Sequence, residues 1–174
     1  MKFILTPVDF SASTARVVDE AVRLVRRFEA AHLVLLHVLY PPEFLGSNVE
    51  ARAHAGLLAT MEAVVERQLA ALKTAISQQG VSVHSLRLTG NPAEVIVEQA
   101  EKLDAVCIVV GAHGHATSSE LVPGGTVNAV LKRARCPVVV VPLSARGARA
   151  NAGACRISAV STARKTSRRG VGHA

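Results

Sequence analysis

The chain has 174 residues, of which 49% are hydrophobic and only 3% are aromatic. This length suits one well-packed domain with an appendage and excludes two large domains, and the core must consist of aliphatic side chains. No apolar run is long enough to predict a membrane span, and residues 1–10 do not resemble a signal peptide. Cys107, Cys136 and Cys155 lack CxxC spacing, so we expect a reduced, cytoplasmic protein without a disulfide framework.

The formal net charge of +7 belongs to the end of the chain. Residues 144–174 hold seven basic and no acidic residues, whereas residues 1–143 hold 13 of each. We therefore predict an α/β domain over 1–143 and a disordered tail over 144–174, rich in Ala, Gly, Ser and Arg. The positive charge of this tail could attract nucleic acid or acidic lipid. The tail, however, has no aromatic residues to stack on bases and no apolar face for a membrane, so we favour a solvated extension.

The first half of the chain predicts two strands and two helices in alternation. A strand ending at Pro7 precedes a helix that starts at about Ser11, with Ser11 or Ser13 as its N-cap. Residues 32–39 (HLVLLHVL) are continuously apolar, as in a strand buried on both faces. A long helix is expected from about residue 49 to residue 79, and Gly80 ends it.

The second half continues the alternation. Residues 81–88 (VSVHSLRL) are typical of a half-buried edge strand, and a helix follows with Pro92 near its first position. Residues 105–111 (AVCIVVG) form a buried strand, and residues 124–134 form a helix that leads to the last strand, PVVVVPL. This order predicts an α/β fold, a doubly wound five-stranded parallel sheet with helices on both faces and right-handed crossovers.

Glycines follow the fourth predicted strand. Gly111 and Gly114 form a G-x-x-G pattern, and Gly124 follows after nine residues. In a doubly wound sheet, ligands bind beyond the carboxyl ends of the strands, where the strand order reverses. If the first and fourth strands are neighbours, Asp9 and this loop share one crevice, where backbone N–H groups and a helix N-terminus could hold phosphates. Neither a Walker P-loop nor a GxGxxG fingerprint is present.

These residues also have purely structural interpretations. Gly111 and Gly114 could serve only to reverse the chain after a buried strand. Asp9 could form an Asx turn or an N-cap, and Gly125 or Thr126 could cap the last helix.

The chemistry of the histidines and of the loop predicts binding rather than catalysis. His113 and His115 are two residues apart with no obvious further ligand, so we expect no metal site there, and His37 is expected to be a satisfied core histidine. The glycine loop has no Lys or Arg, and no serine elbow or Cys–His pairing is recognisable. We therefore expect no catalytic residue and at most slow hydrolysis of a phosphate ligand bound there.

Four stretches within residues 2–142 resemble the universal stress protein family: ILTPVDFSASTARVVDEAV, LVLLHVLYP, GNPAEVIVEQAEKLDAVCIVVGAHG and GGTVNAVLKRARCPVVVVP. The resemblance implies a Rossmann-like, adenine nucleotide α-hydrolase-like fold with strand order 3-2-1-4-5. Nucleotide-binding members carry G-2x-G-9x-G-[ST] and typically bind ATP with a divalent ion, Mg²⁺ or Mn²⁺, at the phosphates.

The resemblance also implies roles for individual residues. Asp9 would bind the ribose hydroxyls, the backbone of Val38 would meet the adenine edge, and Gly111 would line the ribose. Gly114, Gly124 and the following residues would hold the phosphates. The sequence departs from the pattern because Gly125 occupies the [ST] position, and because His115 stands where many members have Arg. The candidate nucleotide-binding residues are Pro7, Val8, Asp9, Val38, Gly111, His113, Gly114, His115, Gly124, Gly125, Thr126 and Val127.

The last strand bears on assembly. An exposed edge of four valines, Val138, Val139, Val140 and Val141, would invite aggregation. The resemblance implies that this strand pairs with its copy in a homodimer, and the alternative is an edge covered by the tail. The expected function is a dimeric, ATP-binding stress-response module. The alternatives are a scaffold that acts through protein contacts without nucleotide, and a hydrolase or nucleotidyl-transferring enzyme.

Overall fold

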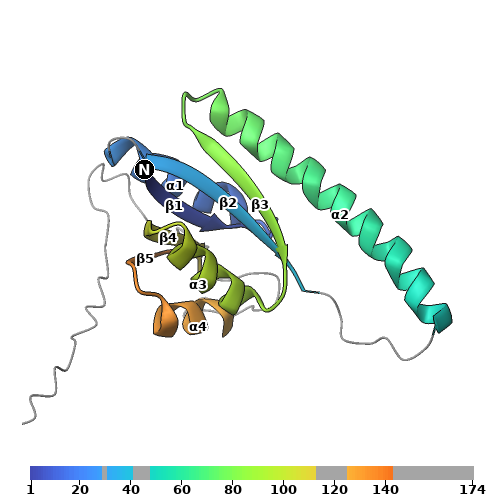
Figure 1. Ribbon diagram of the computed structural model, residues 1–174. Coiled ribbons are helices and arrows are strands. Elements are labelled where there is room, and N and C mark those ends of the chain that lie inside the picture. Colours follow the sequence, from blue (N-terminus) through green and yellow to red (C-terminus); the bar gives the residue numbers. More distant parts are fainter. Residues whose placement is uncertain (29–30, 41–47, 113–124, 143–174) are drawn as a thin grey trace, which may run out of the picture.

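The computed structural model describes residues 1–28, 31–40, 48–112 and 125–142, without the side chains of residues 48–58. The elements in chain order are β1 (Lys2–Pro7), α1 (Thr14–Arg27), β2 (Ala31–Leu39), α2 (Asn48–Ser77), β3 (Val83–Thr89), α3 (Pro92–Lys102), β4 (Ala105–Gly111), α4 (Gly125–Arg133) and β5 (Val138–Val141). The five strands form one parallel sheet in the order β3-β2-β1-β4-β5 (Figure 1). The predicted fold class and strand order are confirmed.

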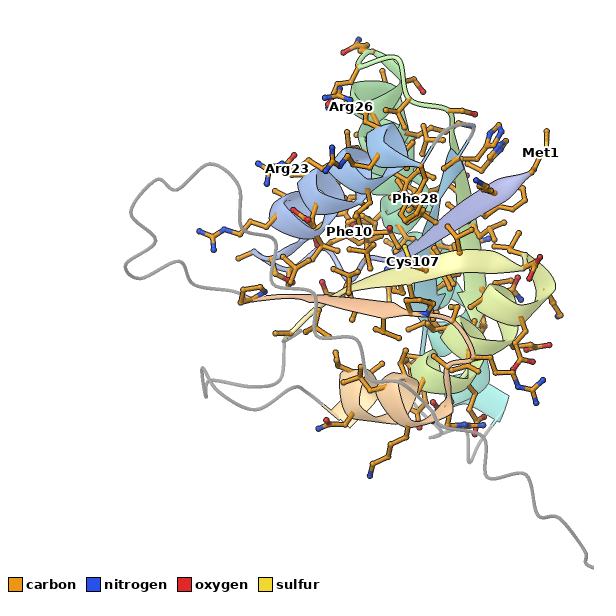
Figure 2. All side chains as sticks on the ribbon, turned by 90° about the vertical axis from the view of Figure 1, so that its left-hand side faces the viewer. Met1, Phe10, Arg23, Arg26, Phe28 and Cys107 are labelled. Carbon is orange, nitrogen blue, oxygen red and sulfur yellow. The ribbon has the colours of Figure 1, made fainter. Side chains whose placement is uncertain are left out.

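The sheet divides the core into two layers because neighbouring residues of a strand face opposite ways. Ile4 is fully buried with side chains of α1 and α2, whereas Leu5 is fully buried with side chains of α3 and α4. Figure 2 shows Phe10 and Cys107 on the α1 side of the sheet, with Arg23 and Arg26 on the outer side of α1. The apolar run of β2 is buried on both faces, as the sequence predicts.

The helix termini match the sequence expectations in part. Asn91 caps α3 through its side chain and Pro92 opens that helix, as expected. Gly80 closes the turn after α2 with φ of 75°, a conformation that glycine adopts without strain.

The start of α1 differs from the prediction. The helix begins at Thr14 rather than near Ser11, and its N-cap residue, Ser13, makes no capping hydrogen bond with its side chain. The Ser13 hydroxyl instead lies 2.8 Å from the Ser11 hydroxyl, and the Ser11 N–H donates to Asp9. Local side-chain hydrogen bonds therefore hold residues 9–13 in a turn and delay the helix.

The two edges of the sheet are β3 and β5, as the sequence predicts. Along β3, Arg87 forms ion pairs with Glu62 and Glu66 of α2, at 2.9 and 3.8 Å between nitrogen and oxygen. All four valines of β5 are partly exposed. Among the helices in the described ranges, none is long and apolar enough to cross a membrane. The predicted tail over 144–174 lies outside the described residues.

Candidate functional site

A cleft of about 840 Å³ lies beyond the carboxyl ends of the strands, and both β1 and β4 contribute to it. These two strands are hydrogen-bonded neighbours, yet their crossover helices pack on opposite faces of the sheet, so the cleft sits where the strand order reverses. Its described lining consists of Pro7, Val8, Asp9, Ser13, Thr14, Val17, Leu36, His37, Val38, Tyr40, Asn91, Pro92, Ala93, Ile96, Val110, Gly111, Gly125, Thr126, Val127 and Ala129. The first and fourth strands therefore bring Asp9 and Gly111 into one crevice, as the sequence predicts.

Asp9 is held in a turn at the end of β1. Its Oδ1 accepts a hydrogen bond from the Ser11 N–H at 3.0 Å and one from the Thr14 hydroxyl at 3.4 Å. Phe10, which follows, has φ of 58°, in the left-handed region that a non-glycine residue seldom adopts. The Asx turn considered from the sequence is thus present, and it fixes the carboxylate at the wall of the cleft.

His37 joins the ends of β2 and β1. Its Nδ1 lies 2.7 Å from the carbonyl oxygen of Val8. Because a carbonyl only accepts, Nδ1 carries the proton and donates it. The ring also lies 4.9 Å from the ring of Phe10, centroid to centroid. The side chain is satisfied, as expected, but it is half-buried in the lining of the cleft rather than in the core.

The opposite side of the cleft is formed by β4 and α4. Gly111 ends β4, and the next residue, Ala112, donates its N–H to the carbonyl of Val141 at 2.8 Å. Gly125 and Thr126 are the first two residues of α4, and both are exposed. Each therefore lies inside the helix, so the suggestion that one of them is its N-cap is wrong.

Val127, the next residue of α4, is buried, and it also lines the cleft. Four of the candidate residues lie outside the described residues: His113, Gly114, His115 and Gly124.

The N-terminus of α3 forms a third wall of the cleft, which was not predicted from the sequence. Asn91 Oδ1 accepts hydrogen bonds from the N–H groups of Ala93 at 3.0 Å and Glu94 at 3.4 Å. Asn91 and Pro92 line the cleft, and Tyr40, at 58% exposure, lines it from the end of β2. The Asn-Pro pair signals a helix start in the sequence, but no sequence signal shows that this start faces Asp9.

The charge in the cleft is sparse. Among its described lining residues, Asp9 is the one carboxylate, and no Lys or Arg is present. The sequence from Val109 to Leu131, which includes the glycine loop, also contains no Lys or Arg and a single acidic residue, Glu120. An anion here would depend on N–H groups and on the positive end of a helix dipole. The other walls are mostly apolar and suit a flat, apolar ring.

Known proteins are similar to this chain over most of its length. A family model described as the universal stress protein family matches residues 1–142. Universal stress protein A homolog 1 of Coxiella burnetii is 30% identical over 141 residues, which are 80% of this chain and 95% of that protein. Universal stress protein MJ0531 of Methanocaldococcus jannaschii is 29% identical over 140 residues, 80% of this chain and 81% of that protein.

Solved structures share the fold. That of the hypothetical protein MJ0577 of Methanocaldococcus jannaschii has a TM-score of 0.71 and 26% identity, and covers 80% of this chain and 94% of its own. A universal stress protein in complex with cAMP has a TM-score of 0.61 at 21% identity, over 82% of this chain and 98% of its own. The Archaeoglobus fulgidus universal stress protein in complex with dAMP has a TM-score of 0.57 at 22% identity, over 80% and 97% respectively. The family model over residues 1–142 and the relative at 30% identity show that the chain belongs to the universal stress protein family.

Proposed function

We propose that the cleft binds an adenine nucleotide, ATP with Mg²⁺ or Mn²⁺ at its phosphates, and that a homodimer carries this occupancy as a stress-response signal. Asp9 binds the ribose hydroxyls, Val38 meets the adenine edge and Gly111 lines the ribose. Gly125, Thr126 and the start of α4 face the phosphates, together with Gly114 and Gly124. In this family of proteins the site, rather than the fold, decides what is bound.

The observation that carries the proposal is the meeting of Asp9, Val38, Gly111 and the N-terminus of α4 around one cleft. A volume of about 840 Å³ lies within the range of roughly 300–1,000 Å³ that is typical of small-molecule sites. A carboxylate held in a turn is a suitable acceptor for two ribose hydroxyls. Two solved structures of this fold hold cAMP and dAMP, both adenine nucleotides, which supports the choice of base.

The phosphates are expected to contribute modestly to the affinity for the nucleotide. Since the described lining has no cationic side chain, backbone N–H groups and a divalent ion must offset the charge of a triphosphate. Asp9 is the one described carboxylate of the cleft, so the ion would be held by phosphate oxygens and water, as Mg²⁺ often is. Without an Arg or Lys to stabilise charge on a transferred phosphoryl group, hydrolysis is expected to be slow at most.

The test is the thermal midpoint of unfolding, measured with and without millimolar ATP and Mg²⁺, alongside native mass spectrometry for retained nucleotide. A ligand at about 100 times its Kd stabilises the folded state by about 2.7 kcal/mol, so a clear upward shift is expected. No shift and no retained nucleotide would contradict the proposal and support a scaffold without nucleotide. Phosphate release at rates of an ordinary ATPase would instead support the enzyme alternative.

The dimer is proposed to form through β5. Pro137 O and Val141 O accept N–H groups of β4 and its extension. Because backbone groups alternate along a strand, the N–H and C=O of Val138 and Val140 point away from β4. These groups, on partly exposed valines, are available to a second copy of the strand.

The variant Val140→Pro removes one outward N–H, and Val140→Thr is the matched control that keeps it. Light scattering should give a monomer for the proline variant and a dimer for the threonine variant and the wild type. A wild-type monomer, or a proline variant that stays dimeric, would contradict pairing through β5.

A further inference from the structure

Two histidines lie together at the end of the sheet away from the cleft. His32 and His84 are each the second residue of their strand, β2 and β3, whereas the cleft lies at the other end of these strands. The two strands are neighbours, and His84 pairs in register with Val34, two residues beyond His32. The imidazole centroids are 5.9 Å apart, and the ring planes are inclined by 33°. Residues that are 52 positions apart in sequence thus share one face of the sheet.

The ring of His32 is held from two further directions. Its Nδ1 lies 2.7 Å from the hydroxyl oxygen of Ser82. The ring of Phe3 on β1 packs against it, with centroids 5.7 Å apart. A hydrogen bond at one imidazole nitrogen fixes the orientation of the ring and leaves Nε2 as the nitrogen for a ligand, which is how metal-binding histidines are usually supported. His84 is exposed and His32 is half-buried, so solvent ions can reach the pair.

We propose that His32 and His84 together bind a divalent transition-metal ion, Zn²⁺, Ni²⁺ or Cu²⁺, with water at the remaining positions. A metal at about 2.0–2.1 Å from one nitrogen of each ring holds the two ring centroids roughly 5 Å apart. From the observed separation of 5.9 Å the centroids would have to approach by about 1 Å to reach the distance set by the metal, and the exposed His84 side chain is the one expected to move. Imidazole suits these ions and does not suit Mg²⁺, so this site differs in chemistry from the phosphate-bound ion of the cleft.

The site has two protein ligands. Within the described residues, no group of three or more His, Cys, Asp or Glu side chains is placed to hold a metal. Two imidazoles and water make an open, exchangeable site rather than a structural zinc site with four protein ligands. Affinity should follow the usual order of these ions at nitrogen ligands, with Cu²⁺ the tightest.

The experiment is calorimetric titration of the full chain with NiCl₂ and with ZnCl₂, without nucleotide and in a buffer that does not chelate metals. One equivalent should bind to the wild type. His84→Asn and His32→Asn should each weaken binding at least about tenfold. Ser82→Ala should weaken it by about tenfold, the lower end of what the loss of such a supporting partner costs, because both imidazoles remain.

The double variant His113→Asn/His115→Asn is the matched control, since it removes two histidines that are two residues apart in the sequence and should bind as the wild type does. Substoichiometric Cu²⁺ should also broaden the ring-proton NMR signals of His32 and His84 first. His84 is exposed, so misfolding does not account for a loss of binding in His84→Asn. Wild-type affinity in that variant would overturn the site. So would loss of binding in the control, or broadening that begins elsewhere.

Discussion

The cleft has two sides of different construction. On the β1–β2 side, formed by Asp9, Thr14, His37 and Val38, side chains are tied down: Asp9 Oδ1 accepts from Ser11 and Thr14, and His37 donates to the carbonyl of Val8. On the β4–α4 side, the described residues that line the cleft are glycine, valine, alanine and a single threonine, Thr126. The β1–β2 side therefore presents polar side chains in fixed positions to a ligand, whereas the β4–α4 side presents mainly backbone groups and small side chains.

The difference indicates which part of the ligand each side of the cleft binds. Side chains with fixed positions discriminate between ligands, because a wrong partner leaves their polar groups unpaired. Backbone N–H groups at a helix N-terminus accept many anions with little discrimination. We therefore expect the β1–β2 side to select the nucleoside and the β4–α4 side to tolerate different numbers of phosphates.

The largest effect is expected from Asp9→Ala, which removes the carboxylate from the β1–β2 side. Hydrogen bonds to charged groups contribute about 1.5–3 kcal/mol, so affinity for ATP and for adenosine should fall by about tenfold or more, and by similar factors. Calorimetric titration with both ligands measures this. If ATP binding fell while adenosine binding stayed intact, the division of the ligand between the two sides would be wrong.

The control for this change is Asp9→Asn. Its side-chain oxygen can still accept the Ser11 N–H that Asp9 accepts at 3.0 Å, so the turn should survive. Binding in this variant should lie between those of Asp9→Ala and the wild type. Equal losses in both variants, at equal thermal stability, would assign the effect to the charge of Asp9 alone.

A smaller effect is expected from His37→Leu, which removes the donor to Val8 O and keeps an apolar side chain. The unfolding free energy should fall by about 0.5–1.5 kcal/mol, the usual contribution of one hydrogen bond. Nucleotide affinity should fall a few-fold, because the end of β1 that carries Asp9 loses its tie to β2. His37→Asn, whose amide can reach the same carbonyl, should recover both quantities in chemical denaturation and titration, and no recovery would show that His37 does not position β1.

The strands and their parallel pairing could be predicted from the sequence because buried strands have a clear hydrophobic pattern, whereas the strand order came from the resemblance to the family. The runs of β2 and β4 are apolar at successive positions, as strands covered on both faces must be, and Asn91-Pro92 marks the start of α3. The glycines and Asp9 also fall where strands end, so the crevice followed once β1 and β4 were taken as neighbours, an order that the family resemblance implies and the structure has.

Other features of the cleft depend on contacts that no local pattern carries. Of the two predicted N-cap residues of α1, Ser13 does hold the N-cap position, yet its hydroxyl bonds to that of Ser11 instead of to the helix, and the helix starts later than Ser11. The inward placement of His37 depends on the carbonyl of Val8, 29 residues earlier in the chain. The pairing of His32 with His84 similarly follows from the register of β2 on β3.

On the β4–α4 side, Gly125→Ser tests whether a hydroxyl adds to the backbone contacts. Among the described residues, no atom lies within 4 Å of a Cβ built at this position, so we expect a small side chain to fit. Gly125→Ala is the control for the effect of any side chain on the helix. Relative to the alanine variant, the serine variant should bind ATP about two- to tenfold more tightly, the contribution of one neutral hydrogen bond, with adenosine binding unchanged. Equal ATP affinity in the two variants would place the phosphates away from Gly125.

The last prediction concerns β4, the strand beneath the β4–α4 side. Cys107 on β4 is only 4% exposed, so its reactivity reports whether this strand opens locally. Local opening would be expected only if the small side chains of the β4–α4 side made β4 less rigid than β1. Burial, with a lesser contribution from the nearby Cys136, raises the pKa of the Cys107 thiol from 9.0 to about 11. The reactive thiolate is therefore suppressed in the folded chain. Since the pKa is higher in the folded state, this thiol lowers stability as pH rises from about 9 to about 11.

We expect β4 to be as rigid as β1, because it lies between β1 and β5 and its centre is fully buried. Iodoacetamide at pH 8 should then modify the half-buried Cys136 at least about a hundredfold faster than Cys107, whose modification should follow global unfolding. Peptide mass spectrometry over time separates the two sites. Modification of Cys107 well ahead of global unfolding would mean that β4 opens locally. The difference between the two sides of the cleft would then include the rigidity of the strands beneath them.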